Sequence, residues 1–227
     1  RRDEFLHIKK HGKWNEAIRA YLASISFADA QLGRVLDALE QSPHHRNTII
    51  VFWSDHGWHL GEKNHWHKST LWEEATRIPF LISAPGVTLS NTRCSRPVDT
   101  LSIYPTLLEL CGLKPAADLD GTSIVPLLKN PAAQWTIPAI TEFQRGQCAV
   151  RSERYRYIRY ADGTEELYDH HKDPNEWTNL AGDAGHRSVI EQLAPWIPQQ
   201  FAPNAPSKNA YRFDHKTYTW TPKNSKK

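Results

Sequence analysis

Apolar side chains in residues 14–41 recur every three or four positions, the spacing of one face of an α-helix. The members of this stripe are Ile18, Leu22, Ile25, Leu32, Val35, Leu36 and Leu39. Ser42-Pro43 follows the stripe, and proline cannot continue a helix. The pattern predicts one long helix that ends at this proline.

The next apolar segment, NTIIVFW at residues 47–53, is continuous and rich in β-branched side chains. Such a run is typical of a strand buried on both faces, as in a parallel sheet. The segment IPFLISAPG at residues 78–86 has the same character and closes on Pro-Gly. A helix followed by buried strands and polar loops indicates an α/β fold.

Shorter helical patterns follow at residues 69–78, 99–113 and 118–131. The first of these has acidic residues in its first turns, and we expect Ser69 or Thr70 to cap it. The second is amphipathic and ends at Gly112, a residue common just after a helix. The third predicts a turn with a short helical piece.

From residue 137 to residue 170, short alternating runs rich in Tyr, Ile and Val replace the helical stripes. Turn residues separate these runs at Ser152-Glu153 and Asp162-Gly163. The pattern predicts an antiparallel meander, and a final helix is expected over residues 186–197.

The change in composition near residues 130–137 predicts an internal boundary. We expect an α/β portion over residues 1–134 and a small antiparallel subdomain over residues 135–201. A tail rich in Pro, Asn and Lys at residues 202–227 is expected to be extended or disordered.

The charge of the chain is balanced, with 28 basic and 25 acidic residues among 227 and a net charge of +3. This balance argues against a nucleic-acid partner. No apolar run approaches ~18 residues, so we expect no membrane span. The three cysteines are widely spaced, which argues against a disulfide framework and a zinc cluster.

The densest chemistry lies in SDHGWHLGEKNHWHKS at residues 54–69, directly after the first predicted strand. Ligands of open α/β sheets bind beyond the carboxyl ends of strands. Gly57 lets the backbone turn there, so Asp55 and His56 can converge on one ion. The alternative is a carboxylate that caps the next turn beside an exposed histidine.

Lys68 precedes the next predicted helix, and His59, His65 and His67 lie in the same loop. Cationic groups at a helix N-terminus favour an anion. Taken singly, each histidine fits a surface or hydrogen-bonded imidazole better, and the alternative for Lys68 is a solvated surface lysine. As a group beside a metal ligand, they suit a metal-assisted reaction on an anionic ester.

Residues 48–86, TIIVFWSDHGWHLGEKNHWHKSTLWEEATRIPFLISAPG, resemble the second signature region of the sulfatase family in the alkaline-phosphatase-like superfamily. The order SDHGW, LGE, Trp, Lys, R-P and PG is most similar to the iduronate-2-sulfatase-like branch. The resemblance covers most of residues 14–182. It implies the C-terminal part of an alkaline-phosphatase-like wound α/β sheet, followed by a small antiparallel sheet with a packed helix.

In this family, the resemblance implies, Asp55 and His56 bind Ca²⁺ and Lys68 contacts the sulfate and its bridging oxygen. The residue chemistry alone leaves the metal open, with Zn²⁺ or Mg²⁺ as alternatives, because calcium prefers oxygen ligands. We also expect His59 to bind substrate and His65 to act as a catalytic general acid.

The family's nucleophile is a formylglycine formed within a C/S-x-P-x-R motif, and this sequence contains no such motif. We therefore expect the chain to be the C-terminal part of a sulfatase, inactive alone, with the formylglycine on a missing N-terminal part. The expected substrate is a sulfated carbohydrate or small sulfate ester. The family implies a periplasmic, secreted or lysosomal location.

Two other functions remain open. A zinc phosphodiesterase or phosphonate hydrolase of the same superfamily would also use an Asp-His-Gly segment, with further ligands at zinc spacing. A non-catalytic binding module would keep the fold and lack the nucleophile.

Overall fold

The computed structural model describes residues 2–204 and 210–223. Its contacts divide the chain into two units, Arg1–Ile197 and Pro198–Lys227. Every helix in the described part of the chain is too short or too polar to span a lipid bilayer.

The predicted long helix is confirmed as α2 (Trp14–Glu40), which follows the short helix α1 (Arg2–Lys10). None of the 27 residues of α2, all of them described, is buried. Its apolar stripe is instead open to solvent, most clearly at Leu22, Ile25 and Val35, and Phe27 of the same helix is also exposed. The periodicity therefore marks a face that this chain alone does not cover.

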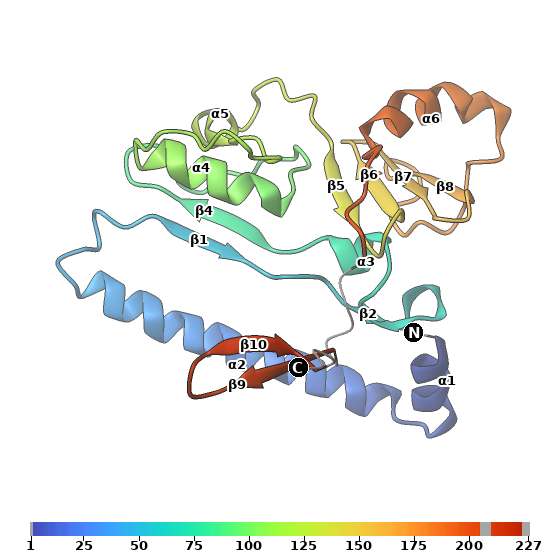
Figure 1. The fold of residues 1–227 in the computed structure, drawn as a ribbon, viewed down its shortest axis with the longest axis horizontal. Coiled ribbons are helices and arrows are strands. Elements are labelled where there is room, and N and C mark those ends of the chain that lie inside the picture. The colour runs from blue at the N-terminus through green and yellow to red at the C-terminus, as the bar shows by residue number, and fades with distance from the viewer. Residues whose placement is uncertain (1, 205–209, 224–227) are drawn as a thin grey trace. The chain divides into compact units, whose positions relative to one another are not determined.

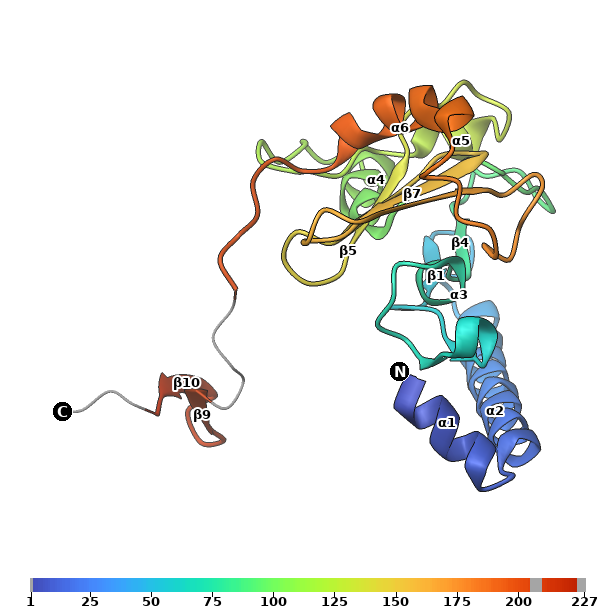
Figure 2. The same ribbon diagram turned by 90° about the vertical axis from the view of Figure 1, so that its right-hand side faces the viewer.

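The first strand, β1 (Ile50–Trp53), pairs with β4 (Phe80–Ser83) in antiparallel register. The prediction of a parallel sheet is wrong for this pair of strands. A parallel pair needs a crossover that carries the chain back along the sheet, and residues 54–79 contain only short elements. Figures 1 and 2 place this pair between α2 on one side and α4 on the other. Phe52, Trp53 and Leu81 remain exposed on it.

The segment between these strands forms β2 (His59–Leu60), a 3₁₀ turn η1 (Glu62–Asn64), β3 (Trp66–His67) and α3 (Glu73–Thr76). β2 and β3 pair as a small hairpin. The expected cap at Ser69 or Thr70 is wrong, because α3 begins later and its N-cap is Trp72. Helices η2 (Thr100–Ser102), α4 (Ile103–Leu110) and α5 (Val125–Lys129) follow.

The predicted antiparallel meander is confirmed as a four-stranded sheet in the order β5-β6-β7-β8. Its strands are β5 (Ala139–Glu142), β6 (Cys148–Arg151), β7 (Tyr155–Arg159) and β8 (Glu165–Asp169). The helical segment after it consists of η3 (Ala184–His186), α6 (Arg187–Leu193) and η4 (Ala194–Trp196).

This sheet carries the main core, because alternate residues of its strands point to opposite faces. On one face, Val150, Tyr157 and Leu167 are fully buried, and α6 lies over the sheet in both views (Figures 1 and 2). On the other face, Ala149, Ile158 and Tyr168 form a buried cluster with Leu71, against which Trp72 packs. The meander thereby holds the chain segment that follows the histidine-rich loop.

In the second unit, β9 (Tyr211–Asp214) and β10 (Thr219–Pro222) form an antiparallel hairpin. This hairpin lies within the predicted tail, so the described part of that tail includes regular structure. Residues 205–209 and 224–227 of the tail lie outside the described residues. The boundary between residues 134 and 135 stays a prediction.

Candidate active site

Asp55 and His56 lie together directly after β1, with Oδ2 of Asp55 3.1 Å from Nε2 of His56. Nδ1 of His56 lies 2.8 Å from the carbonyl oxygen of Gly57. A carbonyl can only accept, so this contact places a ring proton on Nδ1, and the neutral form of the ring then has its lone pair on Nε2. The Ser54 hydroxyl donates to the His56 carbonyl at 2.9 Å and fixes the same turn.

Gly57 sets the path of the chain after this pair. Its backbone N donates to the Ala75 carbonyl at 2.8 Å, which ties the loop to α3. A Cβ at this position would lie 2.0 Å from the backbone oxygen of Glu74. Only glycine permits this approach, so the glycine of Asp-His-Gly is a geometric requirement of the site.

Lys68 approaches the same imidazole from the other end of the loop, with Nζ 2.5 Å from Nε2 of His56. Lys68 and Asp55 are exposed, and the His56 side chain is partly covered. A carboxylate, an imidazole lone pair and an ammonium group therefore converge at the carboxyl end of β1.

This donor set fits a divalent cation. The carboxylate oxygen of Asp55 and the lone pair of His56 face each other at 3.1 Å without a proton between them in the assigned tautomer. Two such acceptors repel unless a cation lies beside them, and the Lys68 ammonium lies against one of them here. Two ligands are fewer than zinc or calcium requires, so other ligands must come from outside this pair.

His65 contacts the backbone beside Lys68, with Nε2 3.2 Å from the Lys68 carbonyl oxygen. Burial, the largest effect, and other nearby positive charge lower the pKa of His65 below its ordinary value. The ring is therefore neutral at neutral pH and placed next to the residue that carries the ammonium. Its role as a general acid stays a prediction.

His59 is fully buried, unlike the other candidates. Its Nε2 lies 2.8 Å from the Thr70 hydroxyl, and its ring meets His65 and Trp72 edge to face. Burial, followed by the charge of His65, lowers the pKa of His59 to about 4. The expected substrate contact needs a surface position, whereas the structure places His59 inside the loop, where it orders Thr70.

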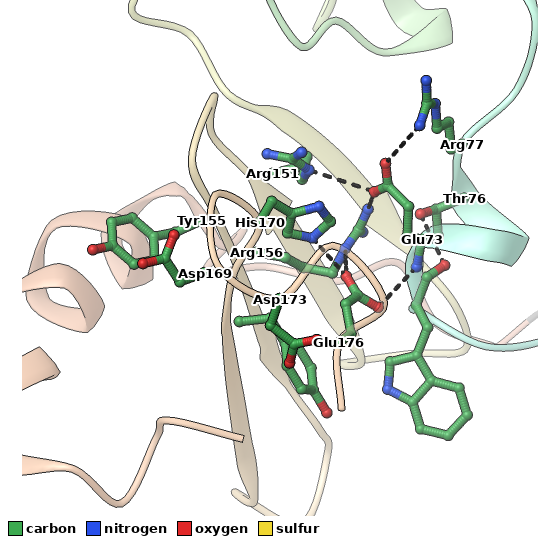
Figure 3. A network of polar contacts seen from close by, with 12 residues as sticks. Glu73, Thr76, Arg77, Arg151, Tyr155, Arg156, Asp169, His170, Asp173 and Glu176 are labelled. Atoms are coloured by element: carbon green, nitrogen blue, oxygen red, sulfur yellow. Dashed lines mark hydrogen bonds and ion pairs between the residues drawn. The ribbon is translucent and has the colours of Figure 1, made fainter. Parts of the chain in front are cut away.

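A buried ion-pair network that was not predicted from the sequence holds α3. Figure 3 shows Arg156 between Glu73 and Glu176. Nε of Arg156 lies 2.6 Å from Glu176 Oε1, and its Nη2 contacts Glu73. His170 Nε2 lies 2.9 Å from the same Glu176 oxygen, and the backbone N of Glu73 donates to Glu176 Oε2 at 3.0 Å.

The electrostatics of this network keep both acids ionised. Burial alone would raise the pKa of Glu73, but Arg156 and Arg151 lower it below its ordinary value. Burial alone would also raise the pKa of Glu176, but His170 and Arg156 lower it below its ordinary value. One feature of the sequence points to this network: Arg156 is a charged residue at a buried position of an alternating strand.

Ligand atoms of Glu73, His170 and Glu176 lie within 4.8 Å of one another, which is close enough for a metal ion. Both carboxylates already contact the guanidinium of Arg156 (Figure 3). A divalent cation would have to approach this positive group, which Coulomb repulsion opposes. The group is an ion-pair network that fixes α3 against the meander.

Two family models match the chain. Residues 3–113 match the family described as sulfatase, and residues 61–201 match the region described as N-sulphoglucosamine sulphohydrolase, C-terminal. A sulfatase of Formosa agariphila is 47% identical over 188 residues, which cover 83% of this chain and 37% of that protein. A Delta 4,5-hexuronate-2-O-sulfatase of Bacteroides thetaiotaomicron is 32% identical over 200 residues, covering 79% and 41%. The chain thus spans about two fifths of these curated relatives.

Solved structures of related enzymes also superpose on this chain. One protein, solved in complex with its substrate D-glucosamine-2-N,6-O-disulfate, superposes with a TM-score of 0.73 at 30% identity, covering 81% of this chain and 40% of that one. The phosphonate monoester hydrolase of Agrobacterium radiobacter superposes with a TM-score of 0.71 at 27% identity, covering 92% and 46%.

These likenesses confirm the predicted alkaline-phosphatase-like fold class with its small antiparallel sheet. The two family matches together run from residue 3 to residue 201 and include the whole candidate site. The chain belongs to the sulfatase family.

Proposed function

We propose that this chain is the C-terminal part of a sulfatase that hydrolyses sulfate esters of a carbohydrate. The observation that carries the proposal is the convergence of Asp55, His56 and Lys68 at the end of β1. Membership of the sulfatase family supports sulfate ester hydrolysis as the reaction at these residues. The relatives named for sulfated sugars support the substrate class. An extracytoplasmic location, whether periplasmic, secreted or lysosomal, is part of the same proposal.

In this proposal Asp55 and His56 hold a divalent cation, with Ca²⁺ as the first candidate. When bound, the cation would offset the negative charge of the sulfate and of the developing oxyanion. His56 presents its Nε2 lone pair because Gly57 holds its Nδ1 proton. Lys68 faces the anion and donates from its ammonium, while His65 steadies the backbone of Lys68.

A formylglycine nucleophile on an N-terminal part of the same protein completes the proposed site. The chain spans about two fifths of its curated relatives, which leaves room for such a part. The exposed apolar residues of α2 and of β1 and β4 support it, because a stable protein rarely leaves such a surface uncovered. We call this chain joined to that N-terminal part the intact enzyme.

Sulfate release by the intact enzyme tests the proposal, using a panel of sulfated sugars and the variant Lys68→Met. We expect the variant to lose roughly 10²- to 10³-fold in kcat because a donor to the transition-state charge is removed. Lys129→Met, an exposed lysine on α5, is the matched control and should retain activity. Full activity of Lys68→Met would contradict the proposed role.

A second candidate is a phosphonate hydrolase, favoured by the superposition on the Agrobacterium radiobacter enzyme. Metal content and substrate choice separate the two. Release of sulfate by an enzyme that contains calcium supports the sulfatase. Stoichiometric zinc with cleavage of phosphonate esters and no sulfate release supports the alternative.

A further inference from the structure

The backbone around Lys68 adopts a conformation that side chains rarely accept. His67 and Ser69, on either side of Lys68, have φ values of 75° and 72°. At the tip of the same loop, Lys63 and Asn64 have φ values of 53° and 55°. Non-glycine residues in the left-handed region persist only where surrounding contacts hold them. The loop therefore needs an anchor.

Lys63 provides contacts of this kind. Its Nζ lies 4.7 Å from the ring centroid of Trp72, 4.5 Å from that of Tyr168 and 6.0 Å from that of Trp177. The ammonium also donates to the Tyr168 hydroxyl at 3.3 Å and to the backbone carbonyl of Glu176. A cation among aromatic faces in a half-buried setting is attracted to the rings and to both acceptors.

The groups around Lys63, which we call the cage, are Trp72, Tyr168, Trp177 and the backbone of Glu176, and further contacts hold them. The Trp72 indole and the Tyr168 hydroxyl both donate to Glu166 Oε2, each at 2.7 Å. Glu176 is held by Arg156 and His170. The loop tip is thus attached to Tyr168 of the meander and to Glu176 in the segment after it, both more than 100 residues away in sequence.

The opposite side of the loop is also confined. A Cβ at Gly61 would lie 2.0 Å from the Trp14 side chain, so the loop turns directly against α2. Gly61 has a φ of 124°, which suits glycine. These contacts hold the chain at residues 61 and 63, and the pairing of β2 with β3 extends the restraint to His67, next to Lys68.

We propose that Lys63 is a positioning residue for Lys68. Its ammonium, held by Trp72, Tyr168 and Glu176, keeps the loop in the left-handed conformation that directs Lys68 at His56. This inference rests on the proposed function of Lys68 and adds the element that places it. Lys63 touches no group that we assign to the chemistry, so it acts through the backbone.

The first test uses nuclear magnetic resonance on the intact enzyme labelled with ε-¹³C lysine. The Lys68 signal is identified by its loss in Lys68→Arg. In Lys63→Met, which removes the charge but keeps an unbranched chain, we expect the Lys68 signal to move to the position of a solvated lysine. In Lys63→Arg, which keeps the cation, it should stay at the wild-type position. An unmoved Lys68 signal in Lys63→Met would overturn the proposal.

The second test is kinetic, on the intact enzyme. We expect Lys63→Met to lower kcat by roughly 10- to 100-fold with little change in KM, because misplacement by about an ångström has costs of this size. Lys63→Arg should recover most of kcat, and Lys129→Met should match wild type. Equal kcat values for wild type and Lys63→Met would contradict the positioning role.

The two failures are distinguishable. If Lys68→Met keeps full activity, the proposed function is wrong, whatever Lys63 does. If Lys68→Met is inactive and Lys63→Met behaves as wild type in both tests, only the positioning role is wrong. Should Lys63→Met not fold, the Lys68 signal is measured instead in Trp177→Leu, which alters the exposed edge of the cage. A smaller displacement of the Lys68 signal in the same direction supports the role, and none overturns it.

Discussion

The ammonium nitrogen of Lys68 lies 2.5 Å from Nε2 of His56, although the two residues are twelve positions apart. One belongs to the turn after β1 and the other to the chain that leaves β3. Their contact brings the two ends of the histidine-rich loop to one point. The geometry of that loop decides whether the candidate site exists, and through Lys63 the loop contacts Tyr168 of the meander and Glu176 in the segment after it.

We predict that Arg156→Met lowers the free energy of unfolding by roughly 3–5 kcal/mol, because it leaves buried carboxylates without their partner. Side chains of Arg156 and Glu176 are only 3% and 0% exposed. Arg187→Met is the control, since its ion pair with Glu191 is 63% and 65% exposed, and should change stability by less than about 0.5 kcal/mol. Urea denaturation measures both. Similar small effects in the two variants would contradict the network's role.

The sequence predicted what depends on local pattern. The spacing of Leu22, Ile25 and Leu32 was sufficient for α2, and alternation with turn residues was sufficient for the meander. Both signals lie within short windows of the chain. Asp55, His56 and Lys68 were identified by their place after a strand and by resemblance, and the structure brings these three together.

The remaining features depend on partners far away in the sequence. The direction of β4 beside β1 is not encoded in the composition of either strand. The burial of His59 follows from packing against Trp72 and His65. The contact of Lys63 with Glu176 spans 113 positions, and no periodicity predicts it.

We predict that Gly57→Ala destabilises the protein by about 1–3 kcal/mol, the usual cost of overpacking. The new Cβ would lie 2.0 Å from the Glu74 backbone oxygen, so the chain must shift. Gly33→Ala provides a control of opposite sign, because nothing lies within 4 Å of its Cβ and the residue is inside α2. We expect Gly33→Ala to raise the free energy of unfolding by up to about 1 kcal/mol, as measured by thermal unfolding. A neutral Gly57→Ala would contradict the close approach.

We predict that stability falls as the pH drops from 6.5 towards 4, in part through His59. Its pKa is about 4 in the folded chain and 6.5 in the unfolded chain. The unfolded state therefore binds the extra proton first, so the free energy of unfolding decreases through this window and is unaffected by His59 above it. The expected loss is about 2 kcal/mol at pH 5.

Urea denaturation at pH 7.5 and pH 5 measures this dependence. His59→Gln, which can still bond to Thr70, should lose less stability between the two pH values than wild type does. An identical pH dependence in wild type and variant would show that His59 does not titrate in this way.

Calorimetric titration of Ca²⁺ into the intact enzyme tests the proposed metal site, in wild type and in Asp55→Asn and His56→Gln. We expect one saturable site in wild type and an affinity at least roughly tenfold weaker in each variant, in line with the loss of a ligand. Lys129→Met should bind as wild type does. Equal affinity in wild type and both variants would mean that Asp55 and His56 do not hold the cation, and the proposed site would be wrong.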